Sequence, residues 1–269
     1  MKLAVVVGAN GFLGSAIVNE LVNRAIEVFA VYNTHFDNID KHAKLIKHDE
    51  LLSSDLHPDW IFYAAGNYAQ SQANLLSINF ILYQYSIKFK HSKTVYISST
   101  NVYGIHSNAI NENSTYNNPG LYALSKLAGE FIVSGMRYYS IVRLTYIFGP
   151  GISNNSFIPQ VIRSAKDLGK ITLFGVGARM QDYIYIDDAV SLCLASAERQ
   201  NNDIYLGATG KSISNKAVAE EISKWTGCSI EYTGEDLGQS FHFDPQNTFK
   251  ELSWFPKTTF SDGIKKMMT

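Results

Sequence analysis

A tyrosine and a lysine four residues apart, Tyr122 and Lys126, have the spacing needed for acid–base chemistry. In a helix, residues four apart lie on the same face, about one turn from each other. A free phenol has a pKa of about 10, and a neighbouring ammonium group stabilises the phenolate and lowers that pKa toward neutrality. Such a tyrosine can act as a general acid or base. Ser99, at the end of a predicted strand, could hold a carbonyl oxygen beside the phenol.

The same residues also have an ordinary structural interpretation. Tyr122 would then be an aromatic residue at a helix start, Lys126 a solvated lysine and Ser99 a hydroxyl at a strand end. The Y-x-x-x-K spacing is common by chance, so a second motif has to support the chemistry.

That second motif is the glycine-rich segment GANGFLG, which stands between a predicted strand and a predicted helix. Glycine allows a tight turn and a close approach of the backbone to a pyrophosphate, which free N–H groups and the helix dipole then hold. The alternative is a tight strand-to-helix turn without a ligand. The residues predicted to contact a dinucleotide here are Gly8, Asn10, Gly11, Phe12, Leu13 and Gly14.

The end of the second predicted strand indicates which dinucleotide is bound. NAD-binding folds usually carry Asp or Glu there, which accepts hydrogen bonds from the adenosine ribose. This chain has Asn33, Thr34 and His35 instead, which can donate to a 2′-phosphate, and Asp37 is expected beyond the strand end. The sequence therefore favours NADP(H), with NAD(H) as the alternative.

Short apolar runs alternate with amphipathic stretches through the first half of the chain, a pattern typical of βαβ units around a parallel sheet. The strands are apolar on both faces, as in a sheet covered on both sides. We therefore predict an α/β fold with a Rossmann-type, doubly wound parallel sheet. The predicted strands are Leu3–Val7, Glu27–Tyr32, Lys44–Lys47, Trp60–Ala65, Thr94–Ser98 and Ser140–Leu144, and the helices Gly11–Arg24, Asn74–Lys90 and Tyr122–Met136.

This alternation stops after Gly149-Pro150-Gly151, where isolated helices with short strands between them begin. We predict helices at Phe157–Leu168, Asp188–Gln200 and Ser214–Trp225, and a late strand at Ile204–Gly207 that returns to the main sheet. The predicted domains are a dinucleotide-binding domain at 1–150, joined again by 182–207, and a smaller substrate-binding lobe at 151–181 and 208–269.

Composition excludes several classes of partner. The chain has 269 residues, 46% hydrophobic and 17% charged, and a formal net charge of −1, which gives no basic surface for nucleic acid or an anionic membrane. Its apolar runs fall far short of the roughly 20 residues of a membrane span. Cys193 and Cys228, in helical-looking segments, lack metal-site or C-x-x-C spacing, so we expect no metal, no disulfide and a cytoplasmic location.

The motifs together resemble the short-chain dehydrogenase/reductases, and most closely their extended branch that acts on nucleotide sugars. The resemblance covers nearly the whole chain and is carried by GANGFLG (8–14), SSTNVYG (98–104), YALSK (122–126), RLTYIFGPG (143–151) and QDYIYIDDA (181–189). It implies that Ser99, Tyr122 and Lys126 form the catalytic set, and that Lys126 also contacts the nicotinamide ribose. It further implies that Asp49 lies near the adenine, that Ala64, Ala65 and Gly66 line the cofactor cleft, and that Asn79 supports the active site.

Two departures from the family pattern narrow the reaction. The 4,6-dehydratase branch has an Asp-Glu pair after the serine, where this chain has Thr100 and Asn101, so dehydration is not expected. Many relatives carry an arginine where Gln181 stands, and Arg179 could substitute for it. The residues predicted to contact the substrate are Thr100, Asn101, Ser156, Phe157, Arg179 and Gln181, and the Asn-rich loop 105–119 is expected to cover the sugar.

The expected activity is NADPH-dependent reduction of the 4-keto group of a nucleotide-linked deoxysugar. An NAD-dependent nucleotide-sugar 4-epimerase is the alternative within the family, and a non-catalytic NADP-binding sensor or scaffold is the alternative from another class. Helix 74–90 is apolar almost all round and helix 122–136 is similar. Because these helices commonly pair across a two-fold axis in this family, we expect a homodimer, with burial inside one chain as the alternative.

Overall fold

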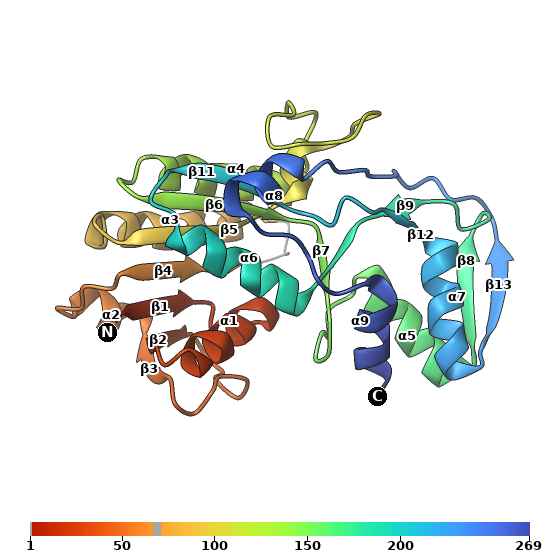
Figure 1. Cartoon of the computed structure of the whole chain (residues 1–269), viewed down its shortest axis with the longest axis horizontal. Coiled ribbons are helices and arrows are strands. Elements are labelled where there is room, and N and C mark those ends of the chain that lie inside the picture. The colour runs from red at the N-terminus through yellow and green to blue at the C-terminus, as the bar shows by residue number, and fades with distance from the viewer. Residues whose placement is uncertain (1, 67–70) are drawn as a thin grey trace.

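A seven-stranded parallel sheet forms the centre of the protein in the computed structural model, which describes residues 2–66 and 71–269 (Figure 1). The strand order is β11-β6-β5-β4-β1-β2-β3. The strands are β1 Leu3–Val7, β2 Glu27–Tyr32, β3 Lys44–Lys47, β4 Trp60–Tyr63, β5 Lys93–Ser99, β6 Tyr139–Leu144 and β11 Asp203–Gly207. This arrangement confirms the predicted α/β fold with a Rossmann-type sheet.

Helices cover both faces of the sheet. Successive side chains of a strand point to opposite faces. Val6 accordingly packs in the same cluster as α1 (Phe12–Asn23) and α6 (Ile186–Glu198), whereas Val5 and Val7 pack with α3 (Gln72–Lys88) and α4 (Leu121–Ser134). Because both faces are buried, the strands are apolar at almost every position, as the sequence indicated.

The strand order reverses between β1 and β4. From β1 the chain builds outward through β2 and β3, and it then returns to place β4 on the other side of β1. In open parallel sheets, ligands bind at the carboxyl ends of the strands where the order reverses. The topology therefore places the expected cofactor cleft beside the ends of β1 and β4, where the glycine turn and residues 64–66 lie.

The second half of the chain adds a smaller lobe, seen on the right of Figure 1. In this lobe α5 packs against α7, and β8 pairs in parallel with β13. Two further pairs, β7 with β10 and β9 with β12, join distant parts of the sequence. The elements are β7 Tyr146–Phe148, α5 Phe157–Leu168, β8 Lys170–Phe174, β9 Met180–Gln181, β10 Tyr183–Tyr185, β12 Ile213–Ser214, α7 Asn215–Thr226, β13 Ser229–Thr233 and α9 Phe260–Met268.

The main sheet receives two late additions. β11 pairs in parallel with β6 at the sheet edge, as predicted for Ile204–Gly207. Helix α8 (Gln246–Leu252) lies next to β11, where the backbone N–H of Leu206 donates to the Thr248 hydroxyl at 2.7 Å. Part of segment 208–269 thus packs on the main sheet, and the division into two domains stays a prediction.

Local signals explain the small differences from the predicted bounds. The Ser71 hydroxyl accepts from the backbone N–H of Asn74, so α3 begins at Gln72 rather than at Asn74. Helix α7 ends at Thr226 because Gly227 adopts a left-handed conformation with φ +69°. Cys228 therefore lies in the turn before β13, and the prediction that it sits in a helix is wrong. Within the described ranges, no helix is both long and apolar enough to span a membrane.

Candidate active site

The turn after β1 leaves no room for a side chain at Gly8 or Gly14. Gly8 has φ +81°, and a Cβ atom there would lie 2.7 Å from the backbone nitrogen of Ala65. A Cβ atom at Gly14 would lie 2.1 Å from the carbonyl oxygen of Gly8, and the N–H of Gly11 donates to that same oxygen at 3.0 Å. The backbone segments that follow β1 and β4 therefore lie close together, at the place where the cofactor cleft is predicted.

The amino end of α1 has the properties of a phosphate site. Its N-cap is Gly11, no side chain of the described residues caps it, and its first turn contains no acid. Backbone N–H groups and the helix dipole at such an end favour an anion. The side chain of Leu13 is buried in the core, so this residue can offer only backbone groups to a cofactor, whereas Phe12 packs against the core and stays partly exposed. The turn thus fits the pyrophosphate of a dinucleotide.

The predicted adenosine side of the site is open to solvent. Asn33, Thr34 and His35 follow β2 and are exposed, and Asp49 is exposed in the first turn of α2 (His48–Ser53), directly after β3. Asn10 holds the loop after β2 against the glycine turn, because its side-chain oxygen accepts from the backbone N–H of Asn38 at 2.9 Å. These residues follow the carboxyl ends of adjacent strands, where the adenosine of a dinucleotide would lie.

The three residues expected to carry the chemistry lie at the ends of β5 and α4. Lys126 is buried on α4, and its Nζ donates to the carbonyl oxygen of Ile97 on β5 at 2.9 Å. A Cβ atom at Gly66 would lie 3.3 Å from this Nζ, which places the lysine beside the segment after β4. Ser99 is half-buried at the end of β5, and Tyr122 is half-buried in the first turn of α4.

Burial sets the electrostatic state of Lys126. Loss of solvation lowers its pKa to about 8, and the charge of Glu130, one turn further along α4, opposes this shift. Near pH 7 most of the Lys126 side chains are therefore still protonated. A buried ammonium group interacts strongly with any negative charge that forms nearby, including a phenolate.

Asn79 joins α3 to α4, the helix that carries Tyr122 and Lys126. Its side-chain nitrogen donates to the carbonyl oxygens of Leu75 at 2.9 Å and of Ser125 at 3.2 Å. Ser125 immediately precedes Lys126, so this contact fixes the helix position where the lysine emerges. The side-chain oxygen of Asn79 is buried and has no hydrogen-bond partner among the described residues. A supporting role for Asn79 is consistent with this position, and cofactor contact stays a prediction.

The predicted substrate contacts fall into three separate places. Thr100, which is buried, and Asn101, which is exposed, begin the 3₁₀ helix Thr100–Tyr103 after Ser99. Arg179 and Gln181 come together, since both donate to the carbonyl oxygen of Gln239, at 2.9 and 3.2 Å.

The third place is the start of α5. Ser156 is the N-cap of that helix and its hydroxyl donates to the side-chain oxygen of Asn154, while Phe157 packs on the core.

A buried ion pair under the site was not anticipated from the sequence. Arg143 on β6 is 1% exposed and binds Glu130 on α4 through two hydrogen bonds, of 2.9 and 2.6 Å. The available signal was weak: an arginine in an otherwise apolar strand, and a glutamate four residues after Lys126.

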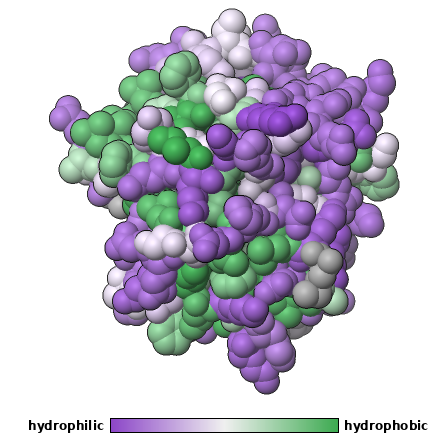
Figure 2. Space-filling model, turned by 90° about the vertical axis from the view of Figure 1, so that its left-hand side faces the viewer, coloured by the Kyte–Doolittle hydropathy of each residue, from purple (hydrophilic) through white to green (hydrophobic). Residues whose placement is uncertain are grey.

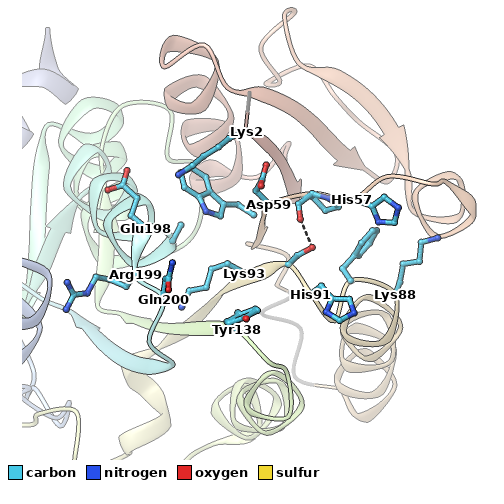
Figure 3. A pocket seen from close by; sticks show the side chains of 15 residues that line it. Lys2, His57, Asp59, Lys88, His91, Lys93, Tyr138, Glu198, Arg199 and Gln200 are labelled. Carbon is cyan, nitrogen blue, oxygen red and sulfur yellow. Dashed lines mark hydrogen bonds between the residues drawn. The ribbon is translucent and has the colours of Figure 1, made fainter.

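A cavity of about 510 Å³ opens at the opposite end of the sheet, where the strands begin (Figure 3). Lys2, Trp60, Lys93 and Tyr138 are among its lining residues, and Lys93 donates to the carbonyl oxygens of Tyr139 and Asn201. Figure 2 shows this end of the molecule, with apolar patches interrupted by polar side chains. None of the predicted site residues lines this cavity, so it is not the expected active site.

The chain matches a known protein family and several characterised relatives. The family model described as "NAD dependent epimerase/dehydratase family" matches residues 4–207. A UDP-glucose 4-epimerase of Lactobacillus helveticus is 25% identical over 323 aligned positions, which cover 98% of this chain and 94% of the relative. A dTDP-4-dehydro-6-deoxyglucose reductase of Escherichia coli is 23% identical, with coverage of 98% and 95%. In another curated match the alignment spans only 58% of the relative.

Solved structures agree on the fold. A crystal structure of UDP-glucose 4-epimerase with UDP-glucose from Thermotoga maritima superimposes with a TM-score of 0.87 at 21% sequence identity. The superposition covers 100% of this chain and 97% of that one. At this level of identity the similarity concerns the fold alone.

Proposed function

Because the chain belongs to the NAD dependent epimerase/dehydratase family, we propose that it is a nucleotide-sugar oxidoreductase that reduces the 4-keto group of a nucleotide-linked deoxysugar with NADPH. The observation that carries this proposal is the position of Lys126. Its ammonium group is buried between Ile97 on β5 and Gly66 after β4, four residues after Tyr122 on the same helix. A buried cation on the same helix face as a phenol, close to the end of β4 and the glycine turn, is suited to proton transfer.

Each residue of the catalytic set has a distinct task in this proposal. The bound cofactor supplies the hydride. Ser99 donates a hydrogen bond to the ketone oxygen, and Tyr122 gives that oxygen its proton. Lys126 stabilises the phenolate that Tyr122 becomes, so the proton is released near neutral pH. General acid assistance of this kind is worth roughly 10²–10⁴ in rate.

The choice of NADPH rests on the end of β2. The family is NAD-dependent, but Asn33, Thr34 and His35 are exposed and uncharged or weakly basic where an acid would repel a 2′-phosphate. A reductase consumes its cofactor in each turnover, whereas an epimerase retains it. A preference for NADP(H) therefore favours one-way reduction over epimerisation.

The substrate would bind between the catalytic set and the smaller lobe. Arg179 is half-buried beside Gln181, and its guanidinium can attract the diphosphate of a nucleotide sugar. In this proposal Thr100 and Asn101, which follow Ser99 directly, contact the sugar. Neither residue has a carboxyl group, so they cannot provide the acid and base with which the dehydratase branch eliminates water.

A 4-epimerase is the second candidate, supported by the similarity to UDP-glucose 4-epimerases. A panel of nucleotide 4-keto-6-deoxysugars, followed by the absorbance of NADPH and NADH, separates the two. We expect consumption of NADPH with at least one member of the panel. Interconversion of unmodified UDP-sugars without net consumption of either cofactor would instead identify an epimerase.

The Tyr122→Phe variant tests whether the protein is an enzyme at all. The variant should lose about 10²- to 10⁴-fold in turnover while its affinity for NADPH stays unchanged, because the phenol acts on the ketone and not on the dinucleotide. A protein that only senses NADP would show no catalytic difference between the wild type and this variant.

We also propose that the protein is a homodimer formed by α3 and α4. On α3 the exposed apolar residues Leu76, Phe80, Tyr83 and Ile87 are spaced by four, three and four residues, so they form one stripe along the helix. On α4 Leu124 is 47% and Phe131 83% exposed. A contiguous apolar surface of this kind is typical of an interface between copies of a chain.

A further inference from the structure

Arg143 carries the most deeply buried guanidinium of the described residues. An isolated buried charge is very costly, and it is retained only when it is paired and hydrogen-bonded. Nε and Nη2 of Arg143 donate to the two carboxylate oxygens of Glu130, and Ser98 donates to the same carboxylate at 2.5 Å. Burial lowers the pKa of Arg143, but the bonds and charge of Glu130 outweigh this effect and raise it. The Arg143 guanidinium therefore keeps its positive charge although it is buried.

The other side of the guanidinium binds two tyrosines. Nη1 donates to the hydroxyl of Tyr103 at 2.9 Å, and Nη2 donates to the hydroxyl of Tyr116 at 2.6 Å. The guanidinium carbon also lies 4.8 and 5.3 Å from the centres of these two rings. Tyr103 ends the 3₁₀ helix after Ser99, and Tyr116 belongs to the Asn-rich loop 105–119. The Arg143 side chain is thus one anchor of the loop, and the only one among the described hydrogen bonds that reaches the Tyr116 side chain.

The partners of Arg143 are neighbours of the catalytic set. Ser98 precedes Ser99 on β5, and Glu130 lies one turn after Lys126 on α4. The loop itself connects the 3₁₀ helix after Ser99 to the helix that begins just before Tyr122. A displacement of the loop would therefore act on both ends of the catalytic set.

The far side of the loop is attached to the C-terminal part of the chain. Ile110 pairs with Phe243, and Glu112 accepts two hydrogen bonds from Thr248, from its backbone N–H and its hydroxyl. Tyr116, by contrast, is 51% exposed, and its hydroxyl contact to Arg143 adds to the backbone pairing of Asn117 with Tyr103 and Ile105 in holding the part of the loop that leads into α4. This contact can be removed without opening the core.

We propose that Tyr116 and Arg143 are positioning residues that hold the loop 105–119 at a fixed place relative to Ser99 and Tyr122, and thereby set the fit of the sugar. The proposal rests on the proposed function, since it assigns this loop to the substrate side of that site. It adds a task for two residues outside the proposed catalytic set. Their effect should appear in the binding of the sugar and not in that of the dinucleotide.

The Tyr116→Phe variant tests this role, with Tyr232→Phe as the matched control. Tyr232 on β13 is similarly exposed, at 49%, and lies in the smaller lobe. With a nucleotide 4-keto-6-deoxysugar and NADPH, Tyr116→Phe should raise the KM for the sugar about 3- to 10-fold, because a hydrogen bond to a charged group is lost. The dissociation constant of NADPH should match that of the wild type. A KM equal to that of the control overturns the proposal.

Hydrogen exchange provides a readout that needs no substrate. Backbone amides of 105–119 should exchange faster in Tyr116→Phe than in the wild type and in Tyr232→Phe, and unchanged exchange overturns the proposal. If exchange accelerates while the wild type reduces no 4-keto sugar, the proposed function fails and the anchoring of the loop stands.

Discussion

The burial of Lys126 predicts an unusual dependence of stability on pH. In the folded protein the pKa of this lysine is lowered to about 8 by burial, and on unfolding it returns to its ordinary value of 10.5. Between these two pH values the unfolded chain binds more protons at this position than the folded chain. The free energy of unfolding contributed by Lys126 therefore rises as the pH increases from about 8 to 10.5.

The gap between the two pKa values sets the size of the effect. It corresponds to roughly 3 kcal/mol of free energy of unfolding. Burial of the charged lysine destabilises the wild type by this amount below pH 8, and the penalty disappears by about pH 10.5. The Lys126→Met variant keeps most of the side-chain volume and has no charge to bury. We therefore compare the free energy of unfolding of this variant with that of the wild type. The variant should gain stability relative to the wild type near pH 7, and this gain should shrink toward pH 10 by an amount approaching roughly 3 kcal/mol.

Urea unfolding of cofactor-free wild type and Lys126→Met at a series of pH values between 7 and 10 measures this difference directly. Comparison of the two proteins at each pH cancels the titration of all other groups, including the buried tyrosines. Lys90→Met is the control, because Lys90 is exposed and loses no solvation on folding. A difference between wild type and Lys126→Met that stays constant across this range would refute the assignment of Lys126 as a buried, partly deprotonated group.

Two further predictions concern the cofactor turn and the dimer. Gly14→Ala should weaken NADPH binding at least tenfold in a fluorescence titration, because its Cβ would lie 2.1 Å from the Gly8 carbonyl oxygen. Gly135→Ala is the control and should bind NADPH normally, because its Cβ would make no contact below 3.4 Å. If the proposed dimer forms, Phe131→Glu should convert it to a folded monomer in sedimentation experiments, with a stability change within about 0.5 kcal/mol, because this side chain is exposed within one chain. A wild type that sediments as a monomer would contradict the proposed interface.

The sequence predicted the parts of the fold whose signals are local. β1 is a run of five apolar residues followed by a glycine, and its observed bounds match the predicted ones. The Tyr122–Lys126 spacing correctly placed both residues on one helix, and the glycine spacing correctly placed a tight turn before α1. These features depend only on neighbouring residues.

Features that depend on distant residues were not predictable in the same way. β7 and β10 contain three residues each, and their pairing joins segments more than thirty residues apart, which periodicity cannot reveal. Arg143 stands in an apolar strand, where its charge alone would suggest exposure. Its burial becomes favourable only through Glu130 and the two tyrosines, which the fold brings together from α4 and the loop.

The late return of β11 makes the two halves of the chain mutually dependent. A fragment that ends at residue 150 would contain the glycine turn and the proposed catalytic set, yet β6 would be left as a bare edge with unpaired backbone groups. Such a fragment should self-associate when expressed alone, because it also lacks α6, which covers one face of the sheet. Engineering that transplants this half onto another scaffold therefore has to include both α6 and the short strand β11.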